Sequence, residues 1–92
     1  MLSQIPYYLK SLKNTDVDRE VCRVGMIAEL DAVSLYEQMA AMAQDPAVKK
    51  IMLDIAKEEK THMGEFQALL LRLDKEQARE LAKGKKEVEE KT

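Results

Sequence analysis

The sequence contains few of the residues that interrupt or cross-link a fold. Its 92 residues include one cysteine, two prolines, three glycines and no tryptophan, and aromatic residues make up only 4%. A single cysteine excludes an internal disulfide and a four-cysteine metal site within one chain, and it suits a reducing cytoplasm. The scarcity of proline and glycine, together with abundant Ala, Leu, Met, Glu and Lys, favours a helical protein.

Charge and hydropathy exclude several classes of partner. The formal net charge is −2 and charged residues make up 35% of the chain, so no basic surface for nucleic acid is expected. The apolar runs are too short to cross a bilayer. The first residues lack the basic start and apolar core of a secretory signal. We therefore expect a cytoplasmic protein with no nucleic-acid and no membrane partner.

Two long segments have helical composition, and a short turn separates them. Residues 16–43 and 46–73 contain no internal proline and one glycine each. Between them, Asp45 is a good N-cap residue and Pro46 a good first helical residue, because the missing N–H of proline would be unpaired there anyway. So short a connection makes the two helices antiparallel neighbours. The sequence therefore predicts an all-α fold built on an antiparallel two-helix hairpin.

The chain divides into three parts. We assign residues 1–15 to an N-terminal extension, 16–74 to the helical hairpin, and 75–92 to a short helix followed by a charged tail. Asp74 is expected to cap the short helix and Gly84 to end it. The tail KGKKEVEEKT has mixed charge and is expected to be frayed or disordered.

Helical spacing selects one mainly apolar stripe on each long helix. On the first helix the stripe contains Cys22, Met26, Glu29, Val33, Tyr36, Ala40 and Ala43. On the second helix it contains Val48, Met52, Ile55, Glu59, His62, Phe66, Leu69 and Leu73. Each stripe is interrupted near its middle, by Glu29 on one helix and by Glu59 with His62 on the other.

The two interruptions are predicted to meet when the hairpin folds. Glu29 lies about 15 residues before the centre of the turn, whereas Glu59 and His62 lie about 15 and 18 residues after it, so at ~1.5 Å per residue all three fall within about one helical turn of the same level. Glu29, Glu59 and His62 are therefore expected to converge in the core.

A bound cation would explain why these side chains are brought together. Two neighbouring buried carboxylates are costly unless a positive charge compensates them. Glutamate with neutral imidazole is a mixed donor set that suits iron, manganese or zinc. Dinuclear carboxylate sites in four-helix bundles use a Glu from each of two helices and Glu-x-x-His from each of the other two. One chain supplies half of that set, so we predict that a homodimer completes both the four-helix bundle and the site.

Each residue also has an interpretation without a metal. His62 could be a satisfied core or interface histidine, and Glu29 could be a buried polar residue that sets the register of the helices. Tyr36 could be ordinary core or a partner of a metal ligand. Cys22 is interpreted as an inert buried thiol. Under these readings the protein would be a helical assembly module without enzymatic activity.

The pattern Glu29-x6-Tyr36, followed by Glu59-x-x-His62, resembles the ferroxidase signature of ferritin-like proteins. The longer stretches IAELDAVSLYEQMA and DIAKEEKTHMGEFQALLLRLD resemble the encapsulated ferritins, the two-helix proteins housed in encapsulin nanocompartments, some of them fused to the shell protein. The resemblance covers residues 20–85.

This resemblance implies a function and an assembly. It implies a di-iron centre shared between two subunits, with Glu29, Glu59 and His62 as ligands and Tyr36 beside the centre. It further implies dimers arranged in an open ring, commonly a decamer, and oxidation of Fe(II) by dioxygen for storage by an encapsulin shell protein. Within that frame, we assign Glu59 as the bridging ligand and Glu29 and His62 as terminal ligands.

The sequence departs from the family pattern at two places. Some members have glutamates at the positions of Ala28 and Asp31, and these glutamates form a secondary metal-uptake site. Of these two positions, only Asp31 is assigned to such a site in this chain. The end KKEVEEKT does not resemble the apolar docking peptide of free-standing cargo. A rubrerythrin-like peroxidase is a further alternative with the same fold, but the absence of CxxC pairs argues against it.

Overall fold

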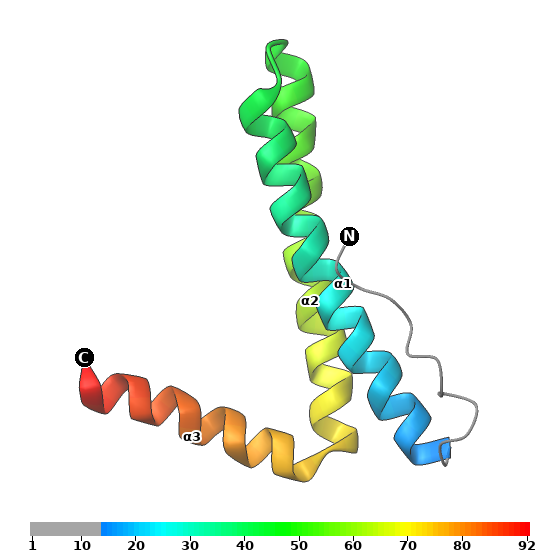
Figure 1. The fold of residues 1–92 in the computed structure, drawn as a ribbon, viewed down its shortest axis with the longest axis vertical. Helices are drawn as coiled ribbons and strands as arrows, with labels where there is room; N and C mark the ends of the chain where they lie inside the picture. Colours follow the sequence, from blue (N-terminus) through cyan, green and yellow to red (C-terminus); the bar gives the residue numbers. More distant parts are fainter. Residues whose placement is uncertain (1–13) are drawn as a thin grey trace.

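The structure, a computed structural model, describes residues 14–92 and contains only helices there (Figure 1). Helix α1 spans Asn14–Met42, α2 spans Pro46–Leu73 and α3 spans Lys75–Lys91. The predicted all-α fold is confirmed, and α1 begins two residues before the predicted start. The expected extension over residues 1–15 lies almost entirely outside the described residues. No helix in the described part is long and apolar enough to cross a membrane.

The turn between α1 and α2 has the predicted capping. The carboxylate of Asp45 accepts a hydrogen bond of 2.7 Å from the N–H of Ala47, and Pro46 is the first helical residue. Asp45 thereby satisfies one of the donors that every helix start leaves unpaired. The chain reverses within a few residues, and α1 and α2 lie side by side along the long axis of the molecule (Figure 1).

The contact between α1 and α2 is narrow and consists of small or medium apolar side chains. The buried residues are Cys22, Val33, Ala40, Ala56 and Leu70. The first three belong to the stripe that the sequence predicts for α1, and the other members of that stripe are half-buried. On this helix the prediction is confirmed.

On α2 the predicted stripe forms the contact with α1 only in part, through half-buried members such as Met52, Glu59 and Phe66. The buried residues Ala56 and Leu70 each lie one position after a predicted member, Ile55 and Leu69, so the centre of the contact is displaced toward them by less than the angle of about 100° between successive residues. An antiparallel pair can cover only part of a wide apolar surface. The remaining part of the stripe on α2 is therefore left to one side of the hairpin.

Asp74 is the only residue between α2 and α3, and it makes several interactions. Its carboxylate accepts a hydrogen bond of 2.9 Å from the N–H of Gln77, which caps α3, and one of 2.8 Å from the guanidinium of Arg23 on α1. Its own N–H donates to the carbonyl of Leu70, 2.9 Å away. The N–H of Gln77, followed by the charges of Arg23 and Arg19, lowers the pKa of Asp74 below its ordinary value.

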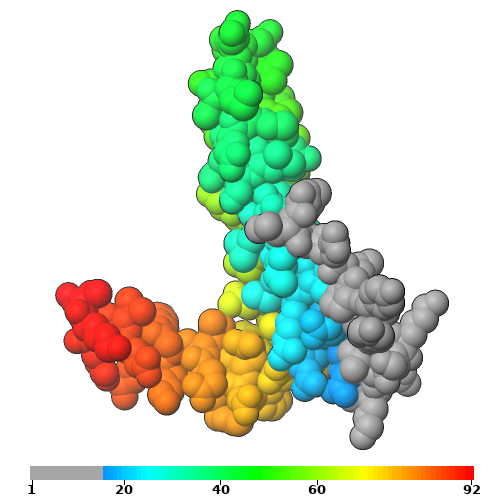
Figure 2. Space-filling model, viewed as in Figure 1, coloured from blue at the N-terminus to red at the C-terminus, as the bar shows by residue number. Residues whose placement is uncertain are grey.

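Helix α3 leaves the lower end of the hairpin and extends sideways, so that the C-terminus lies far from both long helices (Figures 1 and 2). The predicted end at Gly84 and the frayed tail are wrong, because α3 continues to Lys91 and no glycine has a left-handed φ. An interior glycine costs only about 1 kcal/mol relative to alanine, and the following lysines and glutamates are good helix formers.

Much apolar surface remains exposed in the single chain. The large apolar residues that are exposed are Val21, Ile27, Leu30, Leu35, Met42, Val48, Ile51, Leu53, Leu69, Leu73, Leu81 and Val88. The molecule measures 47 × 40 × 18 Å, so it is thin as well as incompletely packed.

Candidate metal centre

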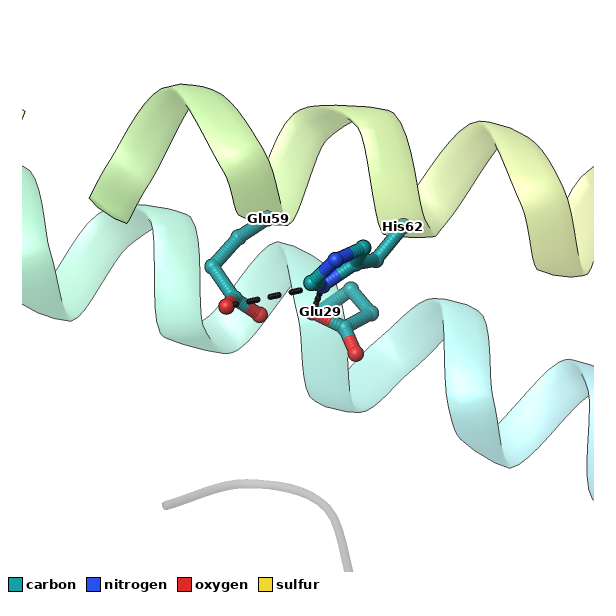
Figure 3. Close-up of side chains that lie close together, drawn as sticks. All are labelled: Glu29, Glu59 and His62. Carbon is teal, nitrogen blue, oxygen red and sulfur yellow. Dashed lines mark ion pairs between the residues drawn. The ribbon is translucent and has the colours of Figure 1, made fainter. Parts of the chain in front are cut away.

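The three predicted ligands come together halfway along the hairpin (Figure 3). Glu29 comes from α1, and Glu59 and His62 come from successive turns of α2. The Nδ1 atom of His62 lies 3.6 Å from Oε1 of Glu59 and 3.7 Å from Oε2 of Glu29. The predicted convergence is therefore confirmed.

The donor atoms of this cluster fit a metal ion. One donor atom from each of the three residues lies within 4.8 Å of the others. Donors that share a zinc-sized ion at ~2.1 Å are about 3 to 4 Å apart, so a small adjustment of these side chains suffices. The set of two carboxylates and one imidazole matches the oxygen and nitrogen preference of iron, manganese and zinc.

The buried oxygen of Glu29 gives an independent indication. Its Oε2 atom is buried and has no hydrogen-bond partner in the described part of the chain. A buried acceptor without a donor costs about 1–3 kcal/mol, more when it is charged. A cation between Glu29, Glu59 and His62 would satisfy this oxygen and offset the repulsion between the two carboxylates.

The cluster is closed on one side and open on the other. The side chains of Glu29 and Glu59 are 19% and 18% exposed, whereas that of His62 is 47% exposed. A groove of about 330 Å³ runs beside them and is lined by Glu29, His62, Glu65, Phe66 and Leu69. In the single chain the three residues therefore converge at an edge of the hairpin. They do so because the contact on α2 is displaced toward Ala56 and Leu70.

Two further predicted site residues lie outside this cluster. Tyr36 is half-buried on α1, two turns after Glu29, and no hydrogen bond joins it to the three ligands within the described residues. Asp31 is half-buried and likewise outside the group of three. The roles of Tyr36 beside the centre and of Asp31 in metal uptake remain predictions.

Cys22 is buried in the contact between the long helices. Burial, and secondarily the charge of Asp18, raises the pKa of its thiol. A raised pKa favours the neutral thiol over the thiolate that binds metals. This supports the interpretation of Cys22 as an inert packing residue.

One contact beside the site is missing from the sequence interpretation. Gly25 of α1 faces the ring of Phe66 on α2, and a Cβ atom at Gly25 would lie only 2.6 Å from the ring. The spacing contained a signal for it: Gly25 precedes Glu29 by four residues, and Phe66 follows His62 by four. In antiparallel helices, one turn back on the first and one turn forward on the second reach the same level.

A helical hairpin with Glu on one helix and Glu-x-x-His on the next defines the ferritin-like class. A family model described as EncFtn-like matches residues 5–86. The chain therefore belongs to the EncFtn-like family, the encapsulated ferritins.

Relatives and a solved structure agree with this family. The chain is 59% identical over 73 residues to a ferritin-like-encapsulin shell fusion protein of Pyrococcus furiosus, covering 79% of this chain and 21% of the relative. It is 33% identical over 69 residues to the encapsulin nanocompartment cargo protein EncC of Myxococcus xanthus, covering 75% and 52%. The chain thus spans about a fifth and about half of these relatives.

The fold also matches an experimental structure. The crystal structure of the encapsulated ferritin domain from Pyrococcus furiosus superposes with a TM-score of 0.77 and 50% sequence identity. The match covers 98% of this chain and 86% of that chain.

Proposed function

We propose that the protein is a ferroxidase, which oxidises Fe(II) to Fe(III) at a di-iron centre shared between two copies of the chain. The observation that carries this proposal is the convergence of Glu29, Glu59 and His62 from two helices, with a buried Glu29 oxygen that has no hydrogen-bond donor. Membership of the EncFtn-like family supports it.

The open side of the cluster supports a dimer. His62 shares one face of α2 with Ile51, Leu69 and Leu73, because these residues are spaced by seven or eleven positions from it. We call these four residues the His62 stripe. Its three apolar members are 52%, 46% and 45% exposed. Large apolar residues that are exposed on one face in this way support an interface there.

A two-fold dimer through the His62 stripe would supply the missing half of the site. Each chain brings three ligands, and a two-fold axis beside His62 would place the partner's equivalent set opposite. The resulting six ligands match the composition of dinuclear carboxylate centres in helical bundles. The ring of dimers implied by the family resemblance is part of this proposal, since apolar residues such as Ile27 and Leu30 remain exposed elsewhere.

The ligands of this chain would assist the oxidation of iron. Carboxylates are hard ligands that favour Fe(III) over Fe(II), and we assign Glu59 as the bridge, with Glu29 and His62 as terminal ligands. In the net reaction two Fe(II) substrates lose one electron each, and one dioxygen takes both electrons with two protons to give hydrogen peroxide. Tyr36 is assigned a place beside the centre.

The oxidised iron needs a container that the described helices do not provide. A molecule only 18 Å thick encloses no storage volume, even as a flat dimer or ring. Relatives are named as an encapsulin shell fusion and an encapsulin nanocompartment cargo protein. We therefore propose that the chain works inside a cytoplasmic encapsulin compartment, with the shell protein as its partner.

The test is an anaerobic Fe(II) titration followed by admission of air, with the ferric absorbance recorded. We expect two irons per dimer. Glu59→Ala and His62→Ala should each weaken metal binding by at least about tenfold, since even the outer partners of metal ligands contribute about 10–100-fold. Glu58→Ala is the matched control, because Glu58 is an exposed neighbour outside the cluster. Equal iron binding and ferric absorbance in all three variants and the wild type would contradict the ferroxidase.

A metal-free assembly module is the second candidate. The distances of 3.6 and 3.7 Å also allow a charged His62 to pair with Glu59 and Glu29, which would fix the register of a helical interface. In that case the dimer would form equally well after chelation, and metal would bind without fixed stoichiometry. A rubrerythrin-like peroxidase would instead oxidise iron faster with hydrogen peroxide than with dioxygen.

A further inference from the structure

Beside the candidate site, the ring of Phe66 on α2 lies directly against Gly25 of α1. An ideal Cβ at this position would lie 2.6 Å from Cδ1, 2.7 Å from Cε1 and 2.7 Å from Cγ of Phe66. Real Cβ atoms do not approach other carbons so closely, so the ring occupies space that any other residue at position 25 would fill. The other two glycines differ, because a Cβ at Gly64 or Gly84 would meet nothing within 4 Å.

This contact lies one helical turn from the ligands on both helices. Gly25 precedes Glu29 by one turn of α1, and Phe66 follows His62 by one turn of α2. Phe66 also lines the same groove as Glu29 and His62. The ring is therefore both a wall of the groove and the side chain that fills the space next to Gly25.

We propose that the contact between Gly25 and Phe66 sets the separation of the two helices at the metal centre, which makes both residues positioning residues for Glu29 and His62. This inference rests on the proposed metal site and adds two residues to it. Neither Gly25 nor Phe66 has a donor atom for the metal, so both act through the ligands.

A methyl group at position 25 can be accommodated in only two ways, and each disturbs the site. If the helices separate, the distance of 3.7 Å between Glu29 and His62 increases. If the ring moves instead, it enters the groove that His62 lines. Protein interiors are packed closely enough that such a change is transmitted to the neighbouring side chains.

The experiment compares Gly25→Ala with Gly64→Ala in the full chain. Both substitutions replace a helical glycine by alanine and gain the same helix propensity, but only the first meets a neighbour. Anaerobic titration with Co(II) alone, followed by its visible absorption spectrum, reports affinity and coordination geometry without relying on oxidation. We expect Gly25→Ala to bind Co(II) about tenfold more weakly with an altered spectrum. Gly64→Ala should match the wild type.

A second substitution tests whether the ring is the cause. Phe66→Leu removes the ring edge that would overlap with a methyl group, so the double variant Gly25→Ala with Phe66→Leu should recover affinity to within about threefold of the wild type. Recovery is the expected result whether Gly25→Ala alone is folded or loses helicity. The inference is overturned if folded Gly25→Ala binds Co(II) like the wild type, or if the double variant binds no better than Gly25→Ala.

Failure of this inference differs from failure of the proposed function. If wild-type protein binds no Co(II) in a manner that depends on Glu59, the metal site itself is absent. If wild-type binding depends on Glu59 but not on Gly25, the site stands and only the positioning role is lost.

Discussion

Two stripes of α2 are both exposed in the single chain, but they differ in composition. The His62 stripe is apolar apart from the histidine. The other stripe contains Asp54, Lys57, Glu58 and Thr61, which line a shallow polar depression. Water can hydrogen-bond to the polar stripe. Exposure of the apolar stripe to water is unfavourable, so covering it with a partner would lower the free energy. This difference supports the proposal that the dimer interface lies on the side of the His62 stripe.

The strongest test places the same charge on each stripe. Leu69→Asp would bury a carboxylate in the proposed interface, and Thr61→Asp would add one to the polar stripe. Burying an unpaired charge costs several kcal/mol, so Leu69→Asp should raise the dimer Kd at least a hundredfold, at about 1.4 kcal/mol per tenfold. Thr61→Asp should leave it unchanged. Sedimentation velocity over a concentration series measures both, and identical profiles for the two variants would remove the distinction between the stripes.

Metal removal tests the proposed dimer interface through the metal ligands that it would contain. Without a cation the clustered carboxylates of Glu29 and Glu59 repel one another across and within the subunits. Saturating iron under anaerobic conditions, at about 100 times its Kd, should stabilise the folded dimer by about 2.7 kcal/mol relative to chelated protein. Thermal unfolding of both samples gives this difference, which Glu59→Ala should abolish. A Tm that is equal with and without chelator in the wild type would favour the metal-free module.

The smallest expected effect lies at the end of α2, where neither stripe is involved. Because the pKa of Asp74 is lowered in the folded protein, its stabilisation is complete above the ordinary carboxyl pKa of about 4 and is lost as the pH falls through the lowered value. Asp74→Asn should therefore show a shallower loss of stability on acidification than the wild type. Urea unfolding at a series of acidic pH values measures the slope. Equal slopes for Asp74→Asn and the wild type would refute the assignment.

The positions of the helices and the ligands could be predicted because they depend on local chemistry. Asp45 and Asp74 cap helices by hydrogen bonds to residues two or three positions away, so the sequence contains the whole interaction. The meeting of Glu29, Glu59 and His62 follows from counting residues on either side of a short turn. These predictions needed no knowledge of how side chains pack.

The displacement of the contact on α2 could not be predicted in the same way. The pattern selects Ile55 and Leu69 because they are apolar and regularly spaced, but Ala56 and Leu70 are the residues of α2 that become buried. An apolar stripe that is wide enough to pack against two helices does not indicate which part of it faces which helix. The contact of Gly25 with Phe66 was accessible in part, because the spacing places both residues one turn from the ligands, whereas the closeness of the ring to Gly25 depends on packing.

The length of α3 illustrates a competition between weak preferences. Gly84 resembles a helix end when read alone, yet a glycine ends a helix through a left-handed conformation, and Gly84 does not adopt one. Several good helix formers on each side outweigh a single poor one.

The single residue between α2 and α3 sets the direction of the last helix. Asp74 is bonded to Leu70, Gln77 and Arg23 at once, so its backbone angles decide the direction of everything that follows. Seventeen residues of α3 extend about 25 Å at ~1.5 Å per residue. A turn of about 10° at this joint would displace the far end by about 4 Å over that length. The position of the far end of α3 would therefore depend on the backbone angles of Asp74.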